Sequence, residues 1–115
     1  MNQLNSLIIE GNAVKKAEIT EPKAGFFVGR FSVAVNRFYK GIDGEEKTEV
    51  SYFDIESYGK MAEILTPKIE KGQGVRIVGR LKQDRWKDAD GKTQSKIYVV
   101  AEHIELKYKP VEKSA

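Results

Sequence analysis

Short stretches rich in β-branched and aromatic residues recur along this 115-residue chain, several with apolar residues at every second position. This pattern is typical of strands that bury one face, because successive side chains of a strand point to opposite sides. We therefore predict five strands, at about residues 4–14, 26–35, 49–57, 74–82 and 96–108. The fifth loses its alternation near Glu102, which predicts a β-bulge at that point.

The alternation also assigns side chains to the two faces of each strand. In residues 49–57 it places Phe53 and Ile55 on the inner side. The outer side then carries Tyr52, Asp54 and Glu56. The other inward sets are Phe27, Phe31, Val33 and Val35 in the second strand, and Val75, Ile77 and Leu81 in the fourth. The sequence therefore predicts half-buried strands with polar outer faces.

One segment between the third and fourth strands has the spacing of a short helix. Its apolar stripe is Met61, Ile64, Leu65 and Ile69, and Gly72 closes it. A proline inside a helix removes a hydrogen bond, so we expect the helix to break near Thr66 and restart with Pro67 in a first turn.

Asp43-Gly44 and Asp90-Gly91 predict the tips of two long connections, between strands two and three and between strands four and five. The resulting order is three strands, one helix and two strands, which is too few strands for an immunoglobulin sandwich. We predict an all-β fold, a five-stranded OB-fold barrel with one short helix between strands 3 and 4. Such barrels bind oligonucleotides on the face of strands two and three and with the adjoining loops.

Composition limits the chain to one domain, which we place at residues 1–108, followed by a short polar tail at 109–115. There is no cysteine, and His103 is the single histidine, so we expect no cofactor, no metal site and no catalytic centre. No run of 18 apolar residues occurs, so we expect a cytoplasmic protein with no membrane partner.

The net charge of +3 is unevenly distributed along the chain. Residues 30–40 carry three basic residues and no acid, and residues 71–96 carry eight Lys or Arg against three Asp. Residues 41–70 carry eight acids against three bases. A solvated surface is the simple explanation of such clusters, and charge alone names no partner.

Four aromatic residues fall on parts of the predicted barrel that build its binding surface. Tyr52 and Tyr58 lie on the outer face of the third strand and at its end, and Tyr39 and Trp86 lie in loops. Aromatic rings beside cations suit single-stranded nucleic acid, because each base offers a face for stacking and each linker a phosphate. The neighbouring cations are Arg37, Lys40, Lys82, Arg85 and Lys87.

Each ring also has a simpler explanation. The tyrosines fit ordinary cross-strand packing. Trp86 has only charged and polar neighbours, so a core role requires a lone anchor from a charged loop, and a protein interface is a further possibility.

The stretches NSLIIEGN, FSVAVNRFY, YFDIESYGKMAE and KGQGVRIVGRLKQDRW, in this order, resemble the bacterial single-stranded-DNA-binding protein family over about residues 3–106. The resemblance implies an OB-fold that wraps single-stranded DNA in replication, recombination and repair. It implies base stacking on Tyr39, Tyr52, Tyr58 and Trp86, and phosphate contacts from Lys60, Lys71 and Arg85.

The chain departs from the family pattern in three respects. Tyrosine stands at three stacking positions where some members have tryptophan, so the stacking area is smaller. Asp54 and Glu56 share the face of Tyr52, where two carboxylates should weaken binding or re-route the strand. The printed residues end at EKSA without the family's long tail and its acidic, apolar tip, so we expect either a truncated chain or a tail-less relative, such as a primosomal or mobile-element variant. Replication and repair proteins are therefore doubtful partners.

Oligomerisation has support in the first strand, where Leu7 and Ile9 occupy one face and Leu4 and Ile8 the other. A strand that is buried on one face only does not need apolar residues on both faces. Barrel closure or cover from the chain ends would also explain the second apolar face. The resemblance implies a homotetramer. Phe53 and Arg76 lie near the positions that make subunit contacts in the family. The number of subunits is therefore open, with a dimer as the alternative to a tetramer.

Rival functions are an RNA-binding or primosomal accessory OB module, or a protein-interaction OB domain. Stacking and phosphate contacts barely separate DNA from RNA, since that distinction needs a group placed on the 2′-hydroxyl.

Overall fold

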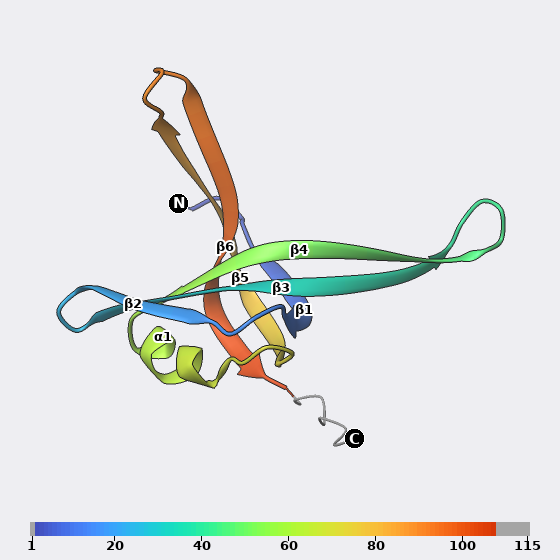
Figure 1. The fold of residues 1–115 in the computed structure, drawn as a ribbon, viewed down its shortest axis with the longest axis horizontal. Coiled ribbons are helices and arrows are strands. Elements are labelled where there is room, and N and C mark those ends of the chain that lie inside the picture. The colour runs from blue at the N-terminus through green and yellow to red at the C-terminus, as the bar shows by residue number, and fades with distance from the viewer. Residues whose placement is uncertain (1, 108–115) are drawn as a thin grey trace.

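The computed structural model describes residues 2–107 and shows a closed barrel from which hairpins project (Figure 1). The strands are β1 (Leu7–Ala13), β2 (Glu18–Lys23), β3 (Phe26–Lys40), β4 (Glu46–Tyr58), β5 (Gly74–Lys87) and β6 (Thr93–Leu106). The helices are α1 (Gly59–Leu65) and the 3₁₀ helix η1 (Thr66–Lys68). The predicted tail at 109–115 and Tyr108 lie outside the described residues.

Two strand contacts close the barrel. The sheet order is β1-β5-β6-β4-β3-β2, and β1 also pairs with β3 through Asn12 and Ala13. All strand pairs are antiparallel except β4 with β6, which pair in parallel at Ile55 with Val99 and Glu56 with Val100. Five strands thus form the barrel, and β2 adds an edge strand, which confirms the predicted OB-fold.

The barrel core is filled by the inward residues of the alternating strands, including Phe31, Val33, Ile55, Ile77 and Val99. Helix α1 and η1 cover the lower end of the barrel, where Met61 and Leu65 pack against the core and Ile69 is fully buried. Ile64 is half exposed, so the predicted stripe holds for three of its four members.

The predicted break in the helical segment is confirmed. Helix α1 ends at Leu65, and Pro67 occupies the first turn of η1, where its missing N–H breaks no hydrogen bond. The predicted bulge is also confirmed, because Val78 pairs with His103 and Gly79 with Ala101, so that Glu102 has no partner in the register.

The main differences from the sequence prediction are the strand ends. The strands continue past the barrel as two-stranded ribbons: the β3–β4 arm, which turns at residues 41–45, and the β5–β6 arm, which turns at 88–92. Gly44 and Gly91 have positive φ angles of 81° and 78° at these turns, as the two Asp-Gly pairs predict. The connections are therefore short, and Tyr39 and Trp86 lie in strands, not in loops.

The sequence prediction also missed β2. None of its residues is buried, so it carries no apolar periodicity. It forms a hairpin with β3, in which Glu18 pairs with Arg30 and Lys23 with Phe26.

Gly29 marks a tight approach between β3, β4 and η1. A Cβ at Gly29 would overlap the hydroxyl of Thr66 and lie 2.8 Å from that of Ser57. Both hydroxyls are buried, and neither has a hydrogen-bond partner among the described residues. The packing leaves no room for a side chain at Gly29.

We predict that Gly29→Ala lowers the free energy of unfolding by about 1 to 3 kcal/mol, the usual cost of overpacking, as measured by urea denaturation. The double variant Gly29→Ala/Thr66→Ala should recover most of the loss, because it removes the hydroxyl in the way of the new methyl group. A double variant as unstable as Gly29→Ala alone would contradict this explanation.

Candidate nucleic-acid interface

The outer face of β3 and β4 is fixed by the core on their inner face. Phe31, Val33 and Ile55 point inward, so the residues that alternate with them point away from the barrel. The cross-strand pairs on this side are Val28 with Tyr58, Arg30 with Glu56, Ser32 with Asp54 and Ala34 with Tyr52. Tyr52 and Tyr58 therefore share one face, and the ring of Tyr52 is 68% exposed.

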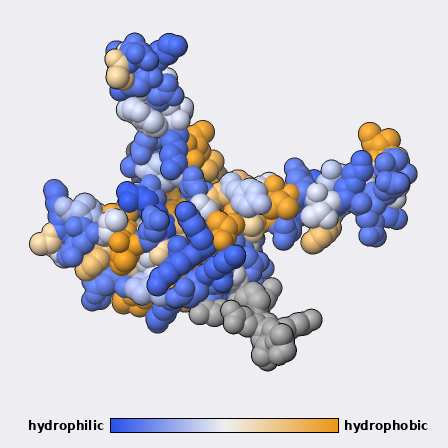
Figure 2. All heavy atoms as spheres, in the orientation of Figure 1, coloured by the Kyte–Doolittle hydropathy of each residue, from blue (hydrophilic) through white to orange (hydrophobic). Residues whose placement is uncertain are grey.

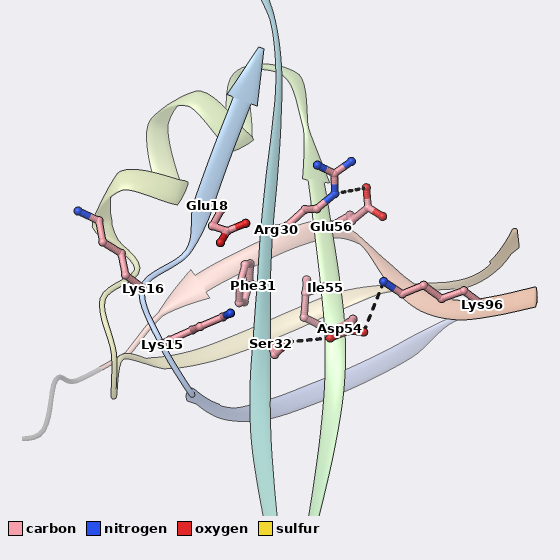
Figure 3. Close-up of a pocket in the computed structure, with 10 residues that line it drawn as sticks. All are labelled: Lys15, Lys16, Glu18, Arg30, Phe31, Ser32, Asp54, Ile55, Glu56 and Lys96. Carbon is pink, nitrogen blue, oxygen red and sulfur yellow. Dashed lines mark hydrogen bonds and ion pairs between the residues drawn. The ribbon is translucent and has the colours of Figure 1, made fainter. Parts of the chain in front are cut away.

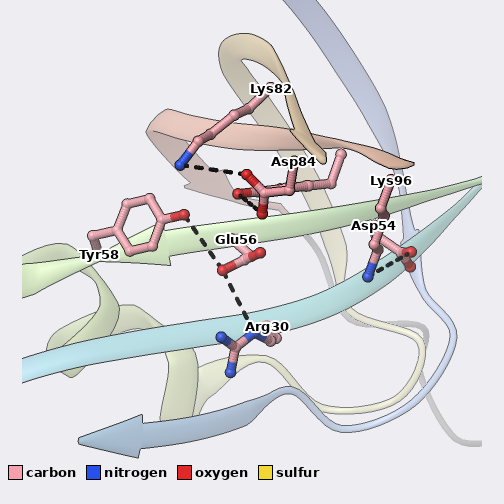
Figure 4. Close-up of polar contacts among 8 residues, drawn as sticks. Arg30, Asp54, Glu56, Tyr58, Lys82, Asp84 and Lys96 are labelled. Carbon is pink, nitrogen blue, oxygen red and sulfur yellow. Dashed lines mark hydrogen bonds and ion pairs between the residues drawn. The ribbon is translucent and has the colours of Figure 1, made fainter. Parts of the chain in front are cut away.

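The β5–β6 arm continues this surface. Lys82 pairs with Tyr98, Asp84 with Lys96 and Trp86 with Gln94, so these residues share one side of the ribbon. Lys96 of β6 reaches Asp54 of β4, with 3.6 Å between Nζ and Oδ2 (Figure 4). This ion pair links the outer side of the β5–β6 arm to the outer face of β3 and β4. We call the combined surface the outer face; it carries Tyr52, Tyr58 and Trp86.

Tyr39 lies on the side of the β3–β4 arm opposite the outer face. It pairs with Lys47, in alternation with the pairs of the outer face, so it points to the other side of the β3–β4 arm. The guanidinium of Arg37, two residues away, lies 5.3 Å from the centroid of the Tyr39 ring, within cation–π range. A single strand would have to cross the edge of the arm to reach both Tyr39 and Tyr52.

The predicted phosphate-binding cations are spread over several elements. Arg37 and Lys40 lie on the β3–β4 arm, Lys60 in α1 and Lys71 in the turn before β5. Lys82 belongs to the outer face, where its Nζ lies 3.8 Å from Asp84. Arg85 and Lys87 alternate with Trp86 along β5, so they lie on the other side of the arm from its ring.

Sequence reasoning missed a hollow of about 170 Å³ in the outer face (Figure 3). Its lining includes four cations, Lys15, Lys16, Arg30 and Lys96, and three carboxylates, Glu18, Asp54 and Glu56. The acid-free stretch at residues 30–40 was a signal for Arg30. Lys15 and Lys16 reach the hollow from the loop after β1, and Lys96 reaches it from β6; only the fold brings these segments together.

The two carboxylates beside Tyr52 are both paired. Asp54 accepts a hydrogen bond of 2.6 Å from the Ser32 hydroxyl, in addition to its contact with Lys96. Glu56 lies 3.5 Å from Nε of Arg30 and accepts a hydrogen bond of 3.4 Å from the hydroxyl of Tyr58. Neighbouring cations thus offset the acid charge that the sequence placed on this face.

The ring of Tyr58 is anchored at both its hydroxyl and its face. Burial, with the neighbouring Tyr98 hydroxyl and the charge of Glu56, raises the pKa of Tyr58 to about 12, so its phenol stays neutral. Burial also raises the pKa of Tyr98, whose hydroxyl donates a 3.0 Å hydrogen bond to Asp84. One face of the Tyr58 ring is stacked on Phe26, with 6.2 Å between centroids and 14° between planes.

The similarity of this chain to known proteins extends over most of its length. Residues 4–107 match the single-strand binding protein family. The chain belongs to this family. It is 38% identical over 107 residues to the single-stranded DNA-binding protein of Aquifex aeolicus, and 34% identical over 106 residues to that of Treponema pallidum. These matches cover 93% and 92% of the chain, and 72% and 59% of the two relatives.

Solved structures of single-strand binding proteins have the same fold. A Plasmodium falciparum member, solved in complex with single-stranded DNA, matches with a TM-score of 0.83 and 21% identity over 94% of this chain and 98% of its own. A deletion mutant of the Thermus aquaticus protein matches with a TM-score of 0.82 and 24% identity, over 91% of this chain and 51% of its own.

Residues 2–107 have neither a membrane-spanning helix nor a cluster of metal-ligating side chains. No described helix is long and apolar enough to cross a membrane. The same residues contain no group of three His, Asp or Glu side chains placed to hold a metal ion.

Proposed function

We propose that this protein binds single-stranded DNA without sequence preference and protects it during replication, recombination and repair. The observation that carries the proposal is the outer face, where Tyr52, Tyr58 and Trp86 lie on one surface beside Lys82, Lys96 and Arg30. Stacking contributes about 1 to 3 kcal/mol per base, and every base has a face to stack. The family and its DNA-bound structural neighbour support the same conclusion.

The remaining predicted site residues extend the path in this proposal. Tyr39 and Arg37 form a second stacking position on the other side of the β3–β4 arm, so the strand wraps around that arm. The cations that neutralise phosphates along the way are Arg37, Lys40, Lys60, Lys71, Lys82, Arg85 and Lys87. Arg85 and Lys87 act on the side of the β5–β6 arm opposite Trp86.

We further propose that residues 1–108 are the binding domain, that binding involves no catalysis or cofactor, and that the protein acts in the cytoplasm. The surface of rings and paired ions supports the assignment of the binding domain. The recruitment of replication and repair proteins lies outside the proposal.

We predict strong quenching of Trp86 fluorescence on titration with oligothymidine, because the half-exposed indole stacks on a base. The affinity should fall between about 50 mM and about 200 mM salt, since phosphate contacts release counterions. Trp86→Ala should weaken binding by about 1 to 3 kcal/mol with an unchanged melting temperature.

Two outcomes would contradict this prediction. Absence of quenching would remove the stacking role of Trp86, and a large loss of thermal stability in Trp86→Ala would return the ring to a structural role. Oligouridine is the matched control: equal binding of both polymers at both salt concentrations would favour a general single-strand binder, and tighter binding of oligouridine an RNA-binding module.

Asp54→Asn should tighten oligothymidine binding by up to about fivefold, the equivalent of about 1 kcal/mol for an exposed ion pair. The substitution removes a negative charge beside Tyr52 and frees Lys96 for a phosphate. Glu105→Gln is the control, because it removes the same charge from an ion pair with Arg76 in another part of the barrel. Equal effects of the two variants, measured by fluorescence titration, would place the DNA away from Asp54.

We also propose that the protein forms a homo-oligomer, either a tetramer or a dimer. Ile8 on β1 is 70% exposed and pairs with Val78, and Leu4, four residues earlier in the chain, is almost fully exposed. Residues 7–12 of β1 pair with β5 on one edge, while only Asn12 and Ala13 pair with β3 on the other. Figure 2 shows further apolar surface at the base of the β5–β6 arm, where Leu81 and Ile97 are exposed.

Multi-angle light scattering should therefore give a mass of two or four chains for the parent protein and a smaller mass for Ile8→Lys, because a buried charge disfavours the contact. Thr20→Lys, on the exposed strand β2, is the control and should keep the parent mass. A monomeric parent protein would contradict the proposal.

A further inference from the structure

Phe26 lies at a position that sequence reasoning assigned to no function. It is the first residue of β3, directly after the turn at Gly25, and pairs with Lys23 of β2. Val28 is directly opposite Tyr58, and Phe26 lies two residues before Val28 on the same side of the strand. Phe26 therefore occupies the next position of the outer face beyond Tyr58.

The two rings are held nearly parallel. Their planes differ by 14° and their centroids are 6.2 Å apart, an offset stack. Tyr58 is anchored through its hydroxyl and half-buried, whereas Phe26 is 43% exposed at the end of the pair. An exposed ring stacked on an anchored one offers a base a preformed aromatic surface.

The surroundings of Phe26 also fit a nucleotide. Lys23, directly opposite in the hairpin, is in no ion pair with a described carboxylate. The nearby Glu21 is engaged by the turn, where its carboxylate accepts a 2.8 Å hydrogen bond from the Gly25 N–H. A phosphate next to a base on Phe26 would therefore meet a free ammonium group.

We infer that Phe26 is a fifth base-stacking residue, which forms a two-ring platform with Tyr58 and extends the single strand onto the β2–β3 hairpin, with Lys23 at its phosphate. This inference rests on the proposed function. It also gives a role to β2, whose residues are all exposed and contribute nothing to the core.

The test uses a tryptophan as a local reporter. Phe26→Trp is made in a Trp86→Phe background, so that a single indole remains, and is titrated with oligothymidine. The matched control is Ile19→Trp in the same background, because Ile19 is 41% exposed in the same hairpin but pairs with Gly29 on the opposite side. We expect quenching at position 26 and little change at position 19.

Affinity gives a second measurement. Phe26→Leu keeps an apolar side chain against Tyr58 but has no aromatic face, so it should weaken oligothymidine binding by about 5- to 150-fold, the loss of one stacked base, with an unchanged melting temperature. Lys23→Gln should reduce the salt dependence of binding, because one phosphate contact is lost.

The outcomes separate this inference from the function on which it depends. Quenching of Trp86 in the parent protein, with no quenching at position 26 and parent affinity for Phe26→Leu, would overturn the role of Phe26 and leave the function standing. If neither Trp86 nor the indole at position 26 responds, single-strand stacking itself fails. Equal quenching at positions 19 and 26 would also overturn the inference, because it would not be specific to one face.

Discussion

Barrel closure is the constraint on which the rest of this structure depends. The parallel contact of β4 with β6 and the short pairing of β1 with β3 turn an open sheet into a barrel. Once Ile55 and Val99 are committed to the core, the alternation of side chains places Asp54, Glu56 and Tyr58 outside. The same closure brings Lys96 of β6 to Asp54 of β4, so the outer face is assembled from strands that are distant in sequence.

The outer face combines two carboxylates with a surface proposed to bind a polyanion. Asp54 and Glu56 lie where a polyanion would bind, and unpaired carboxylates there would repel phosphates. Each is held by a cation of a neighbouring strand, Lys96 and Arg30. The Lys96–Asp54 pair is exposed, and such a pair contributes little to stability, so Lys96 can change its partner at small cost. A phosphate that takes over Lys96 replaces one ion pair by another.

The elements that could be predicted from the sequence are those with a buried face. The five barrel strands and the bulge at Glu102 follow from the apolar pattern, and Pro67 itself predicts the break in the helix. The arms have no core beneath them, so the sequence of polar and charged residues there is typical of loops. The stretch KGIDGEEK nevertheless carries opposite charges across its turn, where Lys40 pairs with Glu46. Cross-strand pairing, which sequence does not reveal, makes Tyr39 and Trp86 strand residues, and the alternation of side chains along β5 then places Arg85 across the arm from Trp86.

Rings at the barrel and rings on the arms differ in how they are supported. Tyr58 is held by Tyr98, Glu56 and Phe26, so little side-chain freedom remains to be lost when a base stacks on it. Tyr39 and Trp86 project on two-stranded ribbons, which are marginally stable by themselves and depend on their anchorage in the barrel. Ordering such a ribbon around a nucleic acid costs conformational entropy that a preformed platform does not. The barrel face is therefore the part of this surface best suited to fix a strand first, and the arms are suited to enclose it afterwards.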